Sequence, residues 1–242
     1  MFELKKIEAE WRARMHKALS FDGAYDYVDG ISPFTHSQGT FCAWIKPNYV
    51  SSVQYVGSSS DEASNSYYFG FLRIDSTGKP SIIVYNDGNP YNLILGSTVL
   101  QTGKWYHICT LSTGSEYKIY VNGREETLTV STGSNDGAWL DKVQNRDNTV
   151  IGALKRSSIS NFFNGTIDEV RIYNRALSPS EIKYLYHNPF DPIDPEHLVL
   201  WLNPAGIDIA NSKWWDLSGK GNHGTIHGAV EKTLIEEEVI VK

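Results

Sequence analysis

The sequence predicts an all-β sandwich or barrel, with a short helix at its start and another in its second half. Runs of about four to eight residues, rich in aromatic and β-branched side chains, alternate with turns of Gly, Asn, Asp and Ser. Fourteen tyrosines and seven tryptophans favour strands in the same way. A length of 242 residues suits one large all-β domain.

The first element is a helix over residues 2–15. Leu4, Ile7, Trp11 and Met15 recur at spacings of three and four, with charged residues between them. This apolar stripe is expected to pack on the domain or on a neighbouring subunit, and it is a possible anchor.

The strands follow from residue 17 onward. We expect them at residues 18–21, 25–28, 40–45, 67–74, 81–85, 92–95, 105–111, 117–121, 149–154, 166–173 and 198–202. Asn122-Gly123, directly after one of these strands, is a strong signal for a two-residue hairpin.

A second helix is expected near residues 179–187. Ser178 is a good N-cap, Pro179 suits the first helical position, and Glu181 completes a capping box. The chain then divides into a Pro-rich linker and a last strand-forming segment.

The predicted domain organisation has three parts. Residues 1–16 form the N-terminal helix, residues 17–230 form the sandwich, and residues 231–242 form a charged tail. Within the sandwich, residues 198–230 follow a linker over residues 188–196.

Composition excludes several classes of function. A net charge of −6 argues against nucleic acid as a main partner, because phosphate binding needs a basic surface. No apolar run is long enough to insert in a membrane, and no secretory signal is visible at the start. Cys42 and Cys109 lie in apolar runs and are expected to be reduced core thiols; a disulfide requires that their strands face each other.

Three stretches together carry a resemblance to a known family. They are Ala-Leu-Ser-Phe-Asp-Gly at residues 18–23, Gly-Thr-Ile-Asp-Glu-Val-Arg-Ile-Tyr-Asn-Arg-Ala-Leu-Ser at 165–178, and Asp-Leu-Ser-Gly-Lys-Gly-Asn-His-Gly-Thr at 216–225. They resemble the laminin-G-like, concanavalin-A-like jelly-roll domains, over about residues 17–230. The resemblance implies a jelly-roll β-sandwich.

The order of these stretches departs from the family. The Asp-Leu-Ser-Gly stretch normally precedes the Ala-Leu-Ser-Phe strand, and here it comes last. Residues 198–230 either complete their own sandwich or complete a neighbouring copy. We favour completion within the chain, because the termini of domains tend to lie close together.

The resemblance also implies a structural calcium ion. The candidate ligands are the Asp168 carboxylate, the Gly23 carbonyl, Asn222 and Asp22. The alternative is that Asp22, Asp216 and Asn222 are ordinary turn residues that bond their own backbone.

Catalysis is not expected. Glycosidases of this broad fold place carboxylates on one face of a strand, whereas the adjacent residues Asp168 and Glu169 should point to opposite faces. No nucleophile elbow or phosphate loop is present. Aromatic candidates for sugar binding, each of which could equally fill the core, are Tyr49, Tyr55, Tyr67, Tyr68, Tyr91 and Trp139.

Two classes of function remain. The first is a non-catalytic binding or surface module of lectin-like fold that recognises carbohydrate or a protein surface. The second is a structural interaction protein, such as a virion surface or decoration protein, that attaches to a particle or to sister subunits through residues 2–15. Either protein would work at an extracellular or virion surface.

Overall fold

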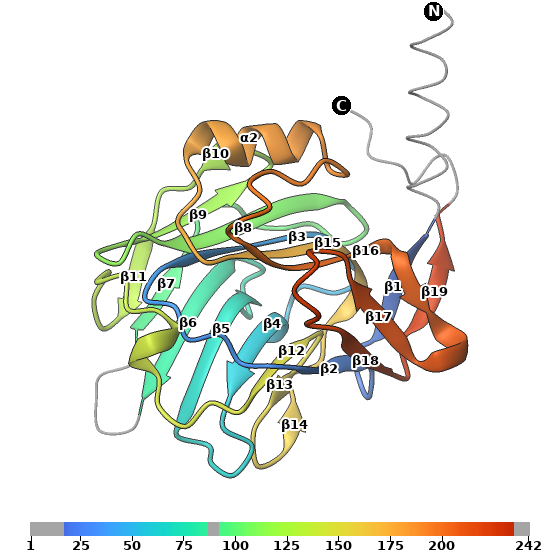
Figure 1. The fold of residues 1–242 in the computed structure, drawn as a ribbon. Helices are drawn as coiled ribbons and strands as arrows, with labels where there is room; N and C mark the ends of the chain where they lie inside the picture. The colour runs from blue at the N-terminus through green and yellow to red at the C-terminus, as the bar shows by residue number, and fades with distance from the viewer. Residues whose placement is uncertain (1–16, 87–91, 235–242) are drawn as a thin grey trace, which may run out of the picture.

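The computed structural model describes residues 17–86 and 92–234, and the predicted β-sandwich is confirmed (Figure 1). One layer is built around β15 (Asn164–Tyr173). Beyond one side of β15 lie β3 (Gly39–Pro47), β8 (Tyr106–Ser112), β9 (Tyr117–Val121) and β10 (Arg124–Glu125). Along its other side lie β1 (Lys17–Asp22) and β16 (Leu198–Asp208), and β19 (Val230–Thr233) pairs with β1.

The second layer packs against the first across the core. Its strands, in spatial order, are β18 (Gly224–His227), β2 (Tyr27–Ile31), β12 (Asn148–Ile151), β4 (Gln54–Ser60), β5 (Tyr67–Ile74), β6 (Pro80–Asn86), β7 (Asn92–Leu95) and β11 (Thr129–Thr132). All of these pairs are antiparallel. β17 (Lys213–Asp216) pairs with both β16 and β18 and so joins the layers, while β13 (Leu154–Lys155) and β14 (Ile159–Ser160) form a small separate hairpin.

The main core lies between the two layers and contains aromatic and aliphatic side chains from both, such as Phe41 and Ile108 of the first and Phe71 of the second. A smaller core lies under helix α2 (Pro179–His187), where Ile182 and Leu185 cover the outer face of the first layer. The helix therefore lies on the outside of the sandwich, as Figure 1 shows.

A disulfide in the smaller core corrects one sequence prediction. Cys42 of β3 lies directly opposite Cys109 of β8, their Cα atoms are 4.1 Å apart, and the two sulfurs are bonded. The expectation of two reduced thiols is therefore wrong. The strands face each other, which was the condition stated for a disulfide.

Several local predictions are confirmed. Helix α2 has its capping box, with Ser178 and Glu181 each bonding the other's backbone. Asn122 and Gly123 both have positive φ, at 51° and 73°, which is typical of the turn that joins β9 and β10.

Other elements differ from the sequence prediction. The strand expected over residues 149–154 ends at Ile151, because Gly152 turns the chain at φ +86° and lies against the Phe21 ring. β4 was not predicted, since its last residues are serines. These serines are buried, and the hydroxyls of Ser58 and Ser59 donate to the carbonyls of Ala153 and Asn148.

The segment after the Pro-rich linker pairs within the same chain. β16 extends the sheet beside β15, β18 pairs with β2, and β19 pairs with β1. Residues 231–233, expected to begin the charged tail, belong to β19. The predicted N-terminal helix and the rest of the tail lie outside the described residues. Within the described part, no helix is long and apolar enough to cross a membrane.

Candidate functional site

The structure spreads the four expected calcium ligands along β15 and does not gather them at one point. Asp22 lies opposite Asn164 at the start of this strand. Asp168 lies four residues further on, which is about 13 Å along a strand. Asn222 donates to the Val199 carbonyl, beside the far end of β15.

The Asp22 carboxylate is engaged locally. Its Oδ1 accepts the backbone N–H groups of Ala24 at 2.7 Å and Tyr25 at 2.9 Å. Burial acts to raise the pKa of Asp22, but these backbone bonds outweigh it and lower the pKa. Gly23 has φ +79° and closes the turn. These residues fit the alternative stated for them, a self-bonded turn, and a calcium site formed by all four residues has no geometric support here.

A β-bulge corrects the prediction for Asp168 and Glu169. Glu169 has φ +50°, and the pairing with β3 slips between Asp168 and Arg171. Asp168 lies opposite Trp44 and Arg171 opposite Cys42, two residues that share the face under α2. Because the Glu169 carboxylate bonds Arg171 Nη2 at 2.6 Å, both acids lie on this one face.

This acid pair is nevertheless closed off. Asp168 is 6% exposed and Glu169 is 1% exposed. Burial, together with the neighbouring charge of Glu169, raises the pKa of Asp168 well above its usual value. Glu169 Oε2 also accepts from Trp201 Nε1 at 2.8 Å. The pair is built into the protein interior, where a polysaccharide substrate has no access.

The aromatic candidates separate into different environments. Tyr55 and Trp139 are buried, Tyr67 packs against the main core, and Tyr91 lies outside the described residues. Tyr49 is 47% exposed. Tyr68 is half-buried and belongs to a cluster on the outer face of the second layer.

We call this cluster the tyrosine face; it comprises Tyr55, Tyr68, Tyr85, Arg73 and Arg156. Tyr68 of β5 and Tyr85 of β6 are cross-strand partners whose rings stack 5.2 Å apart at 17°. The Arg156 guanidinium lies 5.0 Å above the Tyr68 ring. Two tyrosines and a cation thus form one continuous stack.

Gly70 makes room for the ring beneath this stack. A Cβ at Gly70 would lie 2.7 Å from both Tyr55 Cε1 and Ile83 Cγ2. Burial raises the pKa values of Tyr55 and Tyr68, so both phenols stay neutral and can donate hydrogen bonds.

The two arginines make this face basic. Arg73 Nη1 donates to Ser81 Oγ at 3.2 Å, and Arg156 Nη1 donates to the Asn65 carbonyl at 3.4 Å. Within residues 17–86 and 92–234, neither arginine forms an ion pair with a carboxylate. The buried Arg156 Nε also lacks a hydrogen-bond partner there.

Sequence reasoning found Tyr68 but missed Tyr85, Arg73 and Arg156. Tyr85 could have been found, because alternate residues of a strand point to the same face, and Ser81, Ile83 and Tyr85 of β6 share the outer one. Arg156 could not, because the turn after β13 carries it to Tyr68 from 88 residues away in the sequence.

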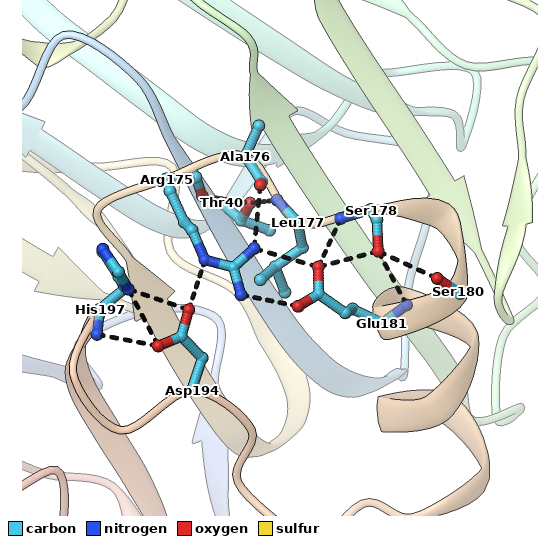
Figure 2. Close-up of polar contacts among 9 residues, drawn as sticks. All are labelled: Thr40, Arg175, Ala176, Leu177, Ser178, Ser180, Glu181, Asp194 and His197. Carbon is cyan, nitrogen blue, oxygen red and sulfur yellow. Dashed lines mark hydrogen bonds and ion pairs between the residues drawn. The ribbon is translucent and has the colours of Figure 1, made fainter.

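On the opposite side of the sandwich, an arginine fixes helix α2 in place. Figure 2 shows Arg175 between Glu181 of the helix and Asp194 of the linker. Its Nη2 and Nη1 donate to the two Glu181 oxygens at 2.7 and 3.0 Å, and its Nε donates to Asp194. His197 Nδ1 lies 2.9 Å from Asp194, so the linker is tied to the same group.

Comparison with known families agrees with this architecture. The family model of the concanavalin A-like lectin/glucanases superfamily matches residues 22–183. The mouse protein named sushi, von Willebrand factor type A, EGF and pentraxin domain-containing protein 1 is 25% identical over 191 residues. That match covers 74% of this chain and 5% of the mouse protein, so the chain spans a small fraction of this relative.

Solved structures show the same fold. A Bacteroides ovatus protein, provisionally described as carbohydrate-binding, has a TM-score of 0.67 at 20% identity. The match covers 91% of this chain and 60% of the Bacteroides chain. The CBM40 of a Ruminococcus gnavus sialidase, bound to α2,3-sialyllactose, has a TM-score of 0.56 at 18% identity, with 63% and 84% covered. A heptameric pentraxin from Limulus polyphemus has a TM-score of 0.53 at 18% identity, with 71% and 82% covered.

Proposed function

Because this chain belongs to the concanavalin A-like lectin/glucanases superfamily, we propose that it is a non-catalytic carbohydrate-binding module whose sugar site is the tyrosine face. The similar structures from Bacteroides ovatus and Ruminococcus gnavus are described as carbohydrate-binding, which supports this choice among the functions of the superfamily. The pentraxin neighbour adds weak support for a homo-oligomer.

The observation that carries the proposal is the stack of Arg156, Tyr68 and Tyr85 on an outer sheet face. Rigid aromatic rings offer apolar area to the C–H faces of a sugar at little entropic cost. The phenols and the two guanidinium groups supply hydrogen bonds to its hydroxyls. Arginine without an acidic partner also favours sugars that carry a carboxylate.

The absence of catalysis is part of the proposal and rests on burial. Asp168 and Glu169 are neighbouring acids on β15, and they lie under α2 on the far side of the sandwich from the tyrosine face. Most glycosidases use two carboxyl groups that flank an accessible bond.

The test is a glycan array followed by titration of the best ligand. We expect saturable binding that Tyr85→Ala and Arg156→Gln each weaken about tenfold, the loss that corresponds to one charge-assisted or stacking contact. Tyr49→Ala is the matched control, because Tyr49 is an exposed tyrosine outside the face. A folded protein that binds no glycan, or whose binding the face variants leave unchanged, would overturn the proposal.

A calcium arm belongs in the same experiment. The expected ligands Asp22, Asp168 and Asn222 lie apart, so we expect glycan binding to persist in EDTA. Binding that EDTA abolishes and calcium restores would instead place a cation site among other residues.

The location proposed for the protein is an extracellular or virion surface. The Cys42–Cys109 disulfide supports an oxidising compartment. The virion surface or decoration role is the alternative function, and deletion of residues 1–16 tests it. Loss of particle attachment or self-assembly, with the sandwich still folded, would favour the structural role over sugar binding.

A further inference from the structure

A pocket lies on the other side of the molecule from the tyrosine face, where helix α2 meets the turn between β9 and β10. Its volume is about 660 Å³, which is within the range of small-molecule sites. Gly123 brings the turn against the helix, since a Cβ there would lie 3.3 Å from Tyr186 Cδ1 and 3.4 Å from Lys183 Cα. Part of the pocket wall is therefore the backbone of the turn, packed against helix α2, and the rest is side chains.

The side chains that line the pocket carry an excess of positive charge. Arg124, Lys183 and His187 line it and are exposed to solvent. Among the described residues, neither Arg124 nor Lys183 forms an ion pair. This local excess contrasts with the net charge of −6 for the whole chain.

In the described part of the chain, a single carboxylate lines the pocket, and it is already engaged. Glu126 Oε2 accepts the Ser97 N–H at 2.8 Å and the Thr98 N–H at 2.6 Å, and Oε1 accepts the Thr98 hydroxyl at 2.8 Å. The neighbouring Glu125 bonds Lys118 and Tyr120. Among the described residues, neither acid pairs with Arg124 or Lys183, since Glu126 is held by neutral donors and Glu125 by Lys118 and Tyr120. These two cations remain available to a ligand.

The end of helix α2 contributes a smaller opposing effect. Carbonyl groups at a helix C-terminus carry partial negative charge, which disfavours an anion. Asn188 offsets part of this, because its backbone N–H and its side-chain amide both donate to the Tyr184 carbonyl, at 2.8 and 3.0 Å. The two full charges of Arg124 and Lys183 exceed what remains.

The pocket also contains aromatic rings. Tyr186 is half-buried and stacks on the buried Trp44, with ring centroids 5.6 Å apart at 23°. Tyr106 is almost fully buried, and its hydroxyl accepts the Gln101 N–H at 3.0 Å. A fixed ring next to two cations suits a ligand that combines an apolar ring face with an acidic group.

We propose that this pocket is a second binding site, for a sugar that carries a carboxylate or sulfate group. The ring of the sugar contacts Tyr186, and Arg124 and Lys183 bind the acidic group. The site is independent of the tyrosine face, because the two lie on opposite outer faces of the sandwich.

The test uses the full chain, labelled with ¹⁵N and titrated by NMR with glucuronic acid and galactose 6-sulfate. Glucose and galactose are the neutral counterparts. We expect saturable shifts at the amides of residues 121–126 and 183–187 with one or both acids, and none with the neutral sugars. Whichever acid binds more tightly identifies the acidic group. Higher salt should weaken the binding, since the pocket is open to solvent.

The decisive variant is the pair Arg124→Gln and Lys183→Gln. Loss of two charge-assisted contacts should weaken the affinity about tenfold or more. Lys104→Gln with Lys220→Gln is the charge-matched control, because both lysines are exposed and lie elsewhere. Tyr85→Ala should leave ligand binding at the pocket unchanged. The pocket proposal and the tyrosine-face proposal can therefore fail independently of each other. Absence of saturable shifts, equal binding of neutral sugars, or unchanged affinity in the folded double variant would each overturn the proposal.

Discussion

His107 is the residue whose protonation state depends most clearly on the fold. It lies fully buried in β8, in contact with both the Trp44 and the Tyr186 rings, and close to Arg171. Burial, with a further contribution from the Arg171 charge, lowers the pKa of His107 from 6.5 to about 3. Between about pH 6.5 and pH 3, the folded protein therefore holds this imidazole neutral while the unfolded chain protonates it.

This shift predicts a specific acid sensitivity. As pH falls from 6.5 towards 3, the unfolded state binds a proton at His107 that the folded state does not, so stability falls. His107→Phe removes this site, and the wild type should lose up to about 1.4 kcal/mol more per pH unit than the variant within that window. Urea unfolding between pH 7 and pH 4 measures the difference. An imidazole that titrates near pH 6.5 in the folded protein, followed by NMR, would show that the prediction is wrong.

At the scale of the element, α2 shows where local sequence is sufficient. Ser178, Pro179 and Glu181 specify its start, and the structure has the same cap. The bulge at Glu169 shows the opposite case. Its backbone is left-handed and its carboxylate bonds Arg171 and the distant Trp201, so alternation along the strand predicted the wrong face for one of the two acids. The buried serines of β4 were missed for a similar reason, because their partners belong to distant segments.

The contacts of Arg175 predict how firmly α2 is held. Bonds from Arg175, together with the cap, lower the pKa of Glu181 to about 2. Arg175→Met should reduce the free energy of unfolding by about 1–2 kcal/mol, a modest figure because the groups are partly exposed. A carboxyl group whose pKa is lower in the folded state stabilises the fold at pH values above its unfolded pKa. The stability difference between the wild type and Arg175→Met should therefore shrink as pH falls from 4.5 towards 2.

Denaturant unfolding and amide exchange in α2 measure this effect. Arg175→Lys is the matched variant, since it keeps the charge but loses the two-pronged contact with Glu181. Its stability should lie between those of the wild type and the Met variant. Equal stability of all three would show that Glu181 and Asp194 hold the helix without the arginine.

For the whole molecule, the fold class followed from composition and periodicity, and the family followed from three short stretches. The binding surfaces did not follow. The tyrosine face brings together residues from β4, β5 and β6 and from the turn after β13, and only the paired sheet shows that these segments meet. The pocket likewise needs a hairpin turn and a helix that are about 60 residues apart in the chain.

Because the first and last described strands pair with each other, we expect the sandwich to tolerate circular permutation, in which its two ends are joined and the chain is opened elsewhere. Lys17 of β1 lies opposite Thr233 of β19, so a short Asn-Gly linker between Leu234 and Lys17 would turn these strands into a hairpin. Opening the chain between Asp191 and Pro192 then restores the order that is usual in the family. Because β16, β18 and β19 keep their partners, we expect a folded protein with the oligomeric state of the original chain and a free energy of unfolding within about 3 kcal/mol of the original. Circular dichroism, urea unfolding and light scattering measure this.

A chain of residues 17–191 is the control and should not fold cooperatively, since the packing partners of buried Trp214, Leu200 and Leu202 would be exposed. A permuted chain that folds only as a dimer, where the original chain is monomeric, would show that the C-terminal strands complete a neighbouring copy instead.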